Sequence, residues 1–261
     1  MNIEGLLFDI DGVLTVSWHA LPGAVTALAR LRTLGLPMRF LTNTTSRTRA
    51  SIAQVLAAEG FAIDAADILT APAATATYLR KAHPGQRCYL LSSGDVAAEL
   101  QGVRMVGDRE PADVVVLGGA GPEFSYERVN HAFHLLAGGA ALVAMHRNML
   151  WRTDAGLDLD AGAYVSGLEK AANRQAEVVG KPSRLFYGAA LAALGTPASR
   201  TLMVGDDVEA DVTGAQAADI RAVLVRTGKY RDADLARAPA PPQAVLDSIA
   251  DLPAWLASRK A

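Results

Sequence analysis

Short apolar runs alternate with amphipathic stretches along almost the whole chain, and this alternation restricts the fold more than any other feature. The run from Ile3 to Phe8 predicts a buried strand, and Pro22 to Leu34 then carries apolar residues at helical spacing. Met38 to Leu41 predicts the next strand, and a helix follows from about Arg47 to Glu59. Strands that alternate with helices form parallel sheets covered by helices. We therefore expect an α/β protein.

The pattern of strands and helices restarts after residues 70–72. Beyond Thr70 we expect five more strands, at residues 88–91, 113–117, 141–145, 201–204 and 222–225. Helices are expected between them, one over 126–136 and one that ends near Leu194. The 261 residues suffice for one large domain or two moderate ones. The composition, 51% hydrophobic but only 6% aromatic, suits helices packed on a sheet.

Charge and cysteine content exclude several classes of protein. The net charge of −2 and the pI near 6.2 give no electrostatic attraction to nucleic acid or to an anionic membrane. A single cysteine, Cys88, excludes an internal disulfide and indicates a reducing compartment. The N-terminus does not resemble a signal peptide, and no apolar run is long enough to cross a bilayer. We expect a cytoplasmic protein with neither nucleic-acid nor membrane partners.

Polar side chains follow three of the predicted strands at the point where each strand ends. They are Asp9 with Asp11, Thr42 with Asn43, and Asp206 with Asp207. In open parallel sheets, ligands bind outside the carboxyl ends of the strands, where the strand order reverses. Each strand end is ordinary by itself, but the three together predict one site.

The segment Asp9-Ile10-Asp11-Gly12 supplies the first pair of acids. Residues two apart in an extended chain face the same way, so both carboxylates can converge on one bound group, and Gly12 then permits a sharp turn. A hairpin turn is the alternative, since Asp-Gly is a frequent hairpin dipeptide. An EF-hand loop is excluded because the third ligand position and the closing Glu are missing.

The segment 205–211 packs four acids into seven residues after a strand. An acid-rich helix N-terminus, favoured by the helix dipole, accounts for Glu209 and Asp211 but poorly for Asp206, which stands where the strand ends. Clustered carboxylates repel one another unless a cation joins them, and Mg²⁺ prefers hard oxygen ligands. The acids therefore predict a Mg²⁺ site.

The segment Thr42 to Ser46 offers hydroxyls, an amide and backbone N–H groups between a strand and a helix. These groups suit a phosphate oxygen, although a plain helix N-cap would use the same residue types. Lys181, between Gly180 and Pro182, is equally compatible with an ordinary surface lysine. Only the position of Lys181 in the sequence, after the first two polar segments and before the acids at 205–211, favours a functional role.

That order resembles the four motifs of the haloacid dehalogenase (HAD) superfamily: Asp9-x-Asp11-Gly12, Thr42-Asn43, Lys181-Pro182, and Gly205-Asp206-Asp207 with Asp211. The long stretch between the second and third motifs resembles subfamily IIA, which inserts an α/β cap there. The resemblance implies a Rossmann-like core at residues 1–76 and 178–261 and a smaller α/β cap domain at 77–177. Residues 205–230 are similar to the branch of phosphatases that act on phospholysine, phosphohistidine and inorganic pyrophosphate.

The resemblance implies a role for each motif residue. Asp9 would be the nucleophile that forms an aspartyl-phosphate, and Asp11 would be the general acid and base. Mg²⁺ would be held by Asp9, the backbone carbonyl of Asp11, and Asp206. Thr42, Asn43 and Lys181 would bind phosphate, while Asp207 and Asp211 would orient the waters of the metal or Lys181.

These motifs predict a Mg²⁺-dependent phosphatase of a small phosphorylated metabolite. The alternatives are a phosphoamide or inorganic pyrophosphate hydrolase and a non-catalytic phosphate-binding module on the same fold. A phosphomutase would need a differently placed cap, and a dehalogenase would need neither Asp11 nor the metal acids. His146 to Arg152 and Asp160 to Tyr164 are the cap segments that we expect to face the substrate, and analogy also suggests a homodimer. The substrate itself cannot be read from the sequence.

Overall fold

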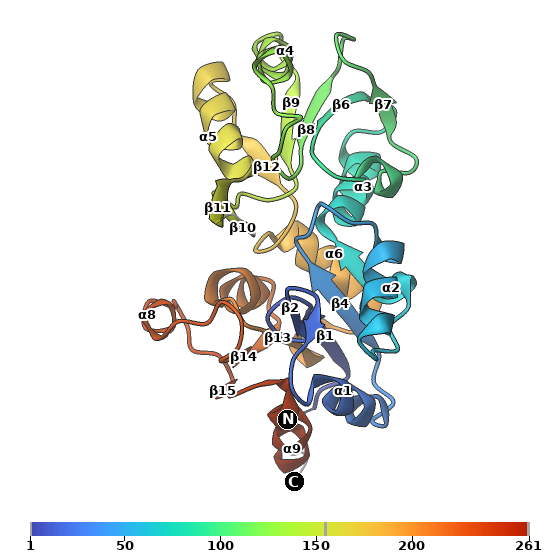
Figure 1. Ribbon diagram of the computed structural model, residues 1–261, viewed down its shortest axis with the longest axis vertical. Helices are drawn as coiled ribbons and strands as arrows, with labels where there is room; N and C mark the ends of the chain where they lie inside the picture. Colours follow the sequence, from blue (N-terminus) through green and yellow to red (C-terminus); the bar gives the residue numbers. More distant parts are fainter. Residues whose placement is uncertain (1, 154–155, 260–261) are drawn as a thin grey trace. The chain divides into compact units, whose positions relative to one another are not determined.

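The computed structural model describes residues 2–153 and 156–259 (Figure 1). Contacts divide the chain into two compact units. The first comprises Met1–Thr42, Arg49–Leu69 and Lys181–Ala261, and the second comprises Asn43–Thr48 and Thr70–Gly180. The domain boundaries expected from the sequence, at 76/77 and 177/178, stay a prediction.

The first unit is built on a six-stranded sheet with the order β15-β14-β13-β1-β4-β5. Its strands are β1 (Gly5–Asp9), β4 (Met38–Thr42), β5 (Ile68–Thr70), β13 (Thr201–Gly205), β14 (Arg221–Val225) and β15 (Ala244–Leu246). The chain runs outward from β1 through β4, then returns to β13 on the other side of β1 and runs outward again. β1 pairs in parallel with both neighbours. The strand order therefore reverses between β1 and β13, where ligands bind in such sheets.

Helices cover both faces of this sheet, as predicted. They are α1 (Ala24–Arg32), α2 (Arg49–Ala58), α6 (Arg184–Leu194), α7 (Gly214–Ala217) and α9 (Leu252–Ser258). The short α8 (Asp232–Leu235), which has no buried residue, belongs to the same unit. Side chains alternate along β1, so Leu6 and Phe8 join one apolar core with residues of α1, α2 and α9. Leu7 is buried on the opposite face, where α6 contacts β4 and α7 contacts β14. A short antiparallel hairpin, β2 (Thr15–Val16) and β3 (His19–Ala20), follows β1.

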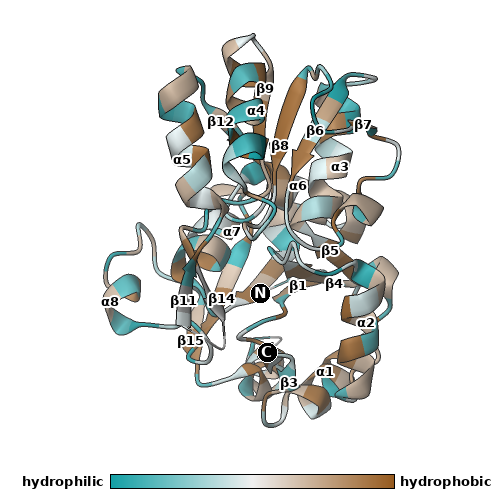
Figure 2. Cartoon of the chain, turned by 45° about the horizontal axis from the view of Figure 1, so that its top comes forward, coloured by the Kyte–Doolittle hydropathy of each residue, from teal (hydrophilic) through white to brown (hydrophobic). Residues whose placement is uncertain are grey.

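The second unit has its own five-stranded sheet with the order β12-β9-β8-β6-β7. The strands are β6 (Arg87–Leu91), β7 (Arg104–Val106), β8 (Val114–Leu117), β9 (Ala141–Ala144) and β12 (Ala176–Val178). The unit also holds α3 (Ala71–Ala82), α4 (Tyr126–Ala137), α5 (Ala161–Ala172) and the antiparallel pair β10 (Leu150–Thr153) and β11 (Gly156–Leu159). Strands β6, β8 and β9 stand out as hydrophobic in Figure 2 and pack against α4 and α5. This confirms the predicted α/β cap.

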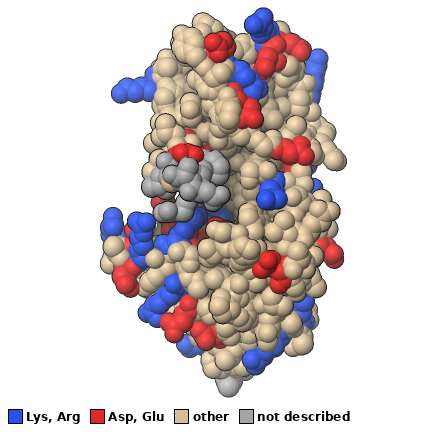
Figure 3. Space-filling model, in the orientation of Figure 1, with Lys and Arg blue, Asp and Glu red and all other residues tan. Residues whose placement is uncertain are grey.

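Charged side chains and helix lengths describe the surface and the elements further. On the face shown in Figure 3, basic and acidic side chains are interspersed. Among residues 2–153 and 156–259, no helix has the length and apolar character needed to cross a membrane.

Candidate active site

The register of the first sheet brings the predicted strand ends to one edge. Asp9 is level with Leu41 of β4, and Phe8 is level with Val204 of β13. Thr42, the last residue of β4, and Asp206, which follows β13, therefore lie just beyond the neighbours of Asp9. Strands β4 and β13 flank β1 (Figure 1). Asp9, Thr42 and Asp206 are all buried. Strand pairing alone thus assembles acids that lie about 200 positions apart in the chain.

Lys181 links two of the buried acids. Its Nζ donates to Asp9 Oδ1 and to Asp211 Oδ1, each at 2.7 Å. Burial opposes the charge on Lys181, but the carboxylates of Asp211 and Asp9 hold its pKa well above the usual value. Lys181 is therefore cationic at neutral pH and offsets part of the acidic charge.

Asp206 is fully buried and has one carboxylate oxygen without a partner. Asp206 Oδ2 accepts from the backbone N–H of Lys229 at 2.6 Å, whereas Oδ1 has no hydrogen-bond partner within the described part of the chain. Burial, followed by the charges of Asp9 and Asp211, raises the pKa of Asp206 to about 9. A buried polar atom left unpaired is costly. Asp206 Oδ1 is therefore suited to bind a cation or to carry a proton.

Two glycines leave room for this carboxylate. A Cβ added to Gly12 would lie 2.1 Å from Asp206 Oδ2, and one added to Gly228 would lie 2.0 Å from the same oxygen. Both have positive φ, +94° and +59° respectively. Glycine is therefore required at both positions, by backbone conformation and by the close approach of Asp206.

The acids fit a divalent cation. Oxygens of Asp9, Asp206 and Asp211 lie within 4.8 Å of one another. Asp211 already accepts from Lys181 through Oδ1, and from the backbone N–H groups of Asp206 and Asp207 through Oδ2. The oxygens best placed for a cation are therefore those of Asp206 and Asp9. Hard, anionic oxygens of this kind suit Mg²⁺.

Asp11 and Asp207 take different positions from the buried acids. Asp11 is accessible to solvent, yet desolvation by the surrounding protein and then the charge of Asp9 raise its pKa. Asp207 Oδ1 accepts from the backbone N–H groups of Glu209 and Ala210, at 3.0 and 2.9 Å. It thereby caps the π-helix η4 (Val208–Thr213), which carries Asp211.

Asn43 belongs to the second unit, together with the rest of the segment 43–48. A Cβ at Gly180 would lie 2.7 Å from Asn43 Oδ1, and one at Gly119 would lie 2.3 Å from Thr45 Oγ1. A Cβ at Gly94 would lie 2.8 Å from the Cα of Ser46. The predicted phosphate-binding segment thus packs against glycines of the cap.

The cap segments named from the sequence have structural contacts of their own. Asp160 is buried and accepts from the backbone N–H groups of Ala120 and Ala161, so it caps α5. Buried His146 has Nδ1 3.9 Å from Asp160 Oδ2. Arg147 pairs with Glu169. The side chains of Trp151 and Arg152 lie outside the described residues.

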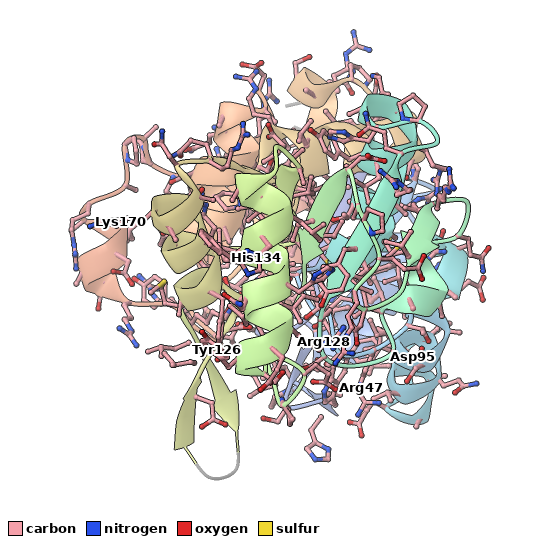
Figure 4. All side chains as sticks on the ribbon, turned by 90° about the horizontal axis from the view of Figure 1, so that it is seen from above. Arg47, Asp95, Tyr126, Arg128, His134 and Lys170 are labelled. Atoms are coloured by element: carbon pink, nitrogen blue, oxygen red, sulfur yellow. The ribbon has the colours of Figure 1, made fainter. Side chains whose placement is uncertain are left out.

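Helix α4 carries two histidines, one exposed and one partly buried. His134 is exposed on α4 (Figure 4). His131 is partly buried and packs edge-to-face against Tyr89, with ring centroids 4.9 Å apart. Neither belongs to a metal-binding cluster among the described residues.

The loop after β14 is a part of the site to which the sequence analysis gave no role. The hydroxyl of Thr227 donates to the carbonyl of Gly12, and the N–H of Lys229 donates to Asp206. Lys229 Nζ lies 3.8 Å from Asp207 Oδ2. The predicted strand at 222–225 was the available signal, because it is a fourth strand whose carboxyl end reaches this edge of the sheet.

Comparisons with known proteins agree with this geometry. The sequence matches the haloacid dehalogenase-like hydrolase family over residues 6–105 and the HAD-hydrolase-like family over residues 178–252. Phospholysine phosphohistidine inorganic pyrophosphate phosphatase of Xenopus laevis is 39% identical over 240 residues, which is 89% of this chain and 87% of the relative. Haloacid dehalogenase-like hydrolase domain-containing protein 2 of Bos taurus is 36% identical over 232 residues, with 89% and 87% covered.

Solved phosphatase structures are similar over nearly the whole chain. The p-nitrophenyl phosphatase of Archaeoglobus fulgidus has a TM-score of 0.90 at 26% identity, with 98% of this chain and 100% of the other covered. The glycerol phosphate phosphatase of Mycobacterium tuberculosis, solved in complex with magnesium, has a TM-score of 0.86 at 28% identity, with 96% and 76% covered. The chain belongs to the haloacid dehalogenase-like hydrolases, subfamily IIA, and is a HAD-type phosphatase.

Proposed function

We propose that this phosphatase hydrolyses a small phosphorylated metabolite with the help of Mg²⁺, through an aspartyl-phosphate on Asp9. The observation that carries the proposal is Oδ1 of buried Asp206, which has no hydrogen-bond partner among residues 2–153 and 156–259. It lies in one cluster with Asp9, which accepts from Lys181. Oδ1 of Asp206 can bind a cation, and the Asp9 carboxylate is held next to it in a fixed orientation.

Asp9 is the nucleophile in this proposal. One of its oxygens accepts from Lys181, which fixes the carboxylate, and the other attacks phosphorus in line while the bond to the leaving oxygen breaks. Water then attacks the aspartyl-phosphate, releasing phosphate and restoring Asp9. Lys181 stabilises the charge on Asp9 and on the transferring phosphoryl group.

Asp11 is the general acid and base. It donates a proton to the leaving oxygen in the first step and takes one from the attacking water in the second. The first role requires a protonated carboxyl, and the raised pKa of Asp11, caused by desolvation and by Asp9, favours that form.

The other site residues bind the metal or the phosphate, or hold these ligands in position. Asp9, the backbone carbonyl of Asp11, and Asp206 would hold Mg²⁺, which would supply positive charge to offset the charge of the phosphate oxygens. Thr42 and Asn43 would bind phosphate oxygens. Asp211 holds Lys181, and Asp207 holds the η4 segment that carries Asp211.

Turnover of p-nitrophenyl phosphate, with Mg²⁺ and with excess EDTA, tests the proposal. Asp9→Asn is expected to abolish phosphate release because the amide is a poor nucleophile. Asp11→Asn is expected to lose roughly a hundred- to ten-thousand-fold in kcat, the usual contribution of acid–base catalysis. Wild-type activity in Asp9→Asn, or full activity in EDTA, would exclude this mechanism.

A second candidate is hydrolysis of phosphoamides or inorganic pyrophosphate. It is favoured by the 39% identity to a phosphatase whose name includes phospholysine, phosphohistidine and inorganic pyrophosphate. The same residues would act on a different leaving group: Asp11 would protonate the departing nitrogen of a phosphoamide, or the bridging oxygen that leaves with phosphate from pyrophosphate. A panel of p-nitrophenyl phosphate, phosphohistidine, phospholysine and pyrophosphate at equal Mg²⁺ ranks the two candidates by kcat/KM.

A further inference from the structure

The loop that follows β14 places a second lysine beside the acids. The N–H of Lys229 donates to Asp206 Oδ2 at 2.6 Å, and the preceding Gly228 packs against the same oxygen. The hydroxyl of Thr227 ties this loop to the carbonyl of Gly12. The backbone of Lys229 is therefore fixed at the edge of the site by contacts that do not involve its ammonium.

The ammonium of Lys229 differs from that of Lys181 in its access to solvent. The Lys181 side chain is 4% exposed and donates to two carboxylates, whereas the Lys229 side chain is 63% exposed. Among residues 2–153 and 156–259, the nearest carboxylate oxygen to Lys229 Nζ belongs to Asp207, at 3.8 Å, beyond hydrogen-bonding distance. The donors of Lys229 are thus available to an incoming anion, and those of Lys181 are already used.

The simplest role for Lys229 is to neutralise the acids, but its separation from them favours a role in binding substrate. An exposed pair at this separation contributes little to stability. A phosphate bound at Asp9 brings its own negative charge to the same edge of the sheet, and a lysine with free donors would bind an anionic group attached to that phosphate.

We propose that Lys229 is a specificity-determining residue that binds an anionic group on the leaving-group side of the substrate. It would favour substrates in which a second phosphoryl group is attached through the scissile oxygen, over esters of neutral alcohols. The proposal rests on the proposed function, since it assumes that phosphate binds beside Asp9.

Titration calorimetry with two non-hydrolysable ligands tests the assignment without turnover. Methylenediphosphonate carries the second phosphonate and methylphosphonate lacks it. Both are titrated into the Mg²⁺-loaded full-length protein at constant free Mg²⁺. The variants are Lys229→Met, Lys229→Arg, and the same substitution at an exposed cap lysine, Lys81→Met.

Wild type and Lys81→Met are expected to bind methylenediphosphonate at least tenfold more tightly than methylphosphonate. Lys229→Met should lose most of this preference, with its affinity for methylphosphonate changed less than twofold, and Lys229→Arg should keep the preference within about threefold, because the charge remains. No preference in wild type, a preference retained in Lys229→Met, or equal losses for both ligands would overturn the proposal. Failure of the proposed function is separate, because it would appear as unimpaired turnover in Asp9→Asn.

Discussion

The Asp206 carboxylate lowers the stability of the metal-free fold and at the same time provides an oxygen for a cation. Its Oδ1 is buried with no hydrogen-bond partner in the described part of the chain, which costs free energy, and the raised pKa of Asp206 reflects its burial. The segment Gly205-Asp206-Asp207 could be read from the sequence as a cluster of acids, because their spacing is local. That one oxygen of Asp206 lacks a partner could not be read, since it depends on which groups of distant strands reach it.

Substitution of Gly12 should destabilise the protein, because Asp206 packs tightly against this position. Gly12→Ala adds both a strained φ of +94° and a Cβ 2.1 Å from Asp206 Oδ2. We expect a loss of about 3 kcal/mol or more in the free energy of unfolding and a weakened response to Mg²⁺. Gly35→Ala is the matched control, with φ +68° and nothing within 4 Å of its Cβ. It should cost only about 1 kcal/mol, from backbone strain alone.

Urea unfolding of both variants, with and without Mg²⁺, measures these differences. Equal losses in the two variants would mean that strain, rather than contact with Asp206, governs position 12.

At the scale of elements, prediction succeeded where an element is long and periodic. Strands β1, β4, β6, β8, β9, β13 and β14 and helices α1, α2, α4 and α6 lie within a few residues of the predicted ranges. Strands of two or three residues, such as β2, β3, β7 and β15, are too short to show a period of two. Helix α3 begins directly after Thr70, which ends strand β5 and caps the helix, so no loop separates the two elements in the sequence.

The π-helix η4 was also beyond prediction, because its register is set by tertiary contacts. The hydroxyl of buried Tyr187, on α6, donates to the carbonyl of Ala210 at 2.7 Å, within η4. π-helical turns occur frequently at functional sites. Here the turn brings the Asp211 carboxylate back to the N–H groups of Asp206 and Asp207.

Tyr187→Phe should therefore destabilise the site as well as the fold. Removing the hydroxyl leaves the carbonyl of Ala210 without this partner, and we expect a loss of about 1–3 kcal/mol in the free energy of unfolding and a fall in kcat. Tyr126→Phe, at a residue that is 79% exposed on α4 (Figure 4), is the control and should change neither quantity. Unchanged stability in Tyr187→Phe would mean that η4 does not depend on this hydrogen bond.

For the whole molecule, the buried acids link stability to pH and to Mg²⁺. The pKa of Asp206 is raised from 3.8 to about 9 by burial and then by its acidic neighbours. A raised carboxyl pKa means that the folded state holds a proton that the unfolded state releases. Its contribution to stability is therefore complete below pH 3.8 and is lost as pH rises through about 9.

The metal-free protein should accordingly lose stability between pH 6 and pH 9, by at most about 1.4 kcal/mol per pH unit for one proton. Mg²⁺ must displace that proton, so its affinity, and the rise in Tm that it causes, should increase over the same interval. Thermal melts at pH 6, 7 and 8, with and without Mg²⁺, measure both effects. Asp206→Asn should remove both, and equal Mg²⁺ affinity at pH 6 and pH 8 in wild type would contradict this linkage.

The division of the chain into units has a consequence for protein engineering. Because residues 43–48 pack with glycines of the second unit, that unit is assembled from two separate stretches of sequence. A chimera that transplants only residues 70–180 onto another scaffold would leave behind the peptide that fills the spaces beside Gly94 and Gly119. Grafts should therefore carry the hexapeptide from Asn43 to Thr48 along with the larger insert, or redesign the residues that it covers.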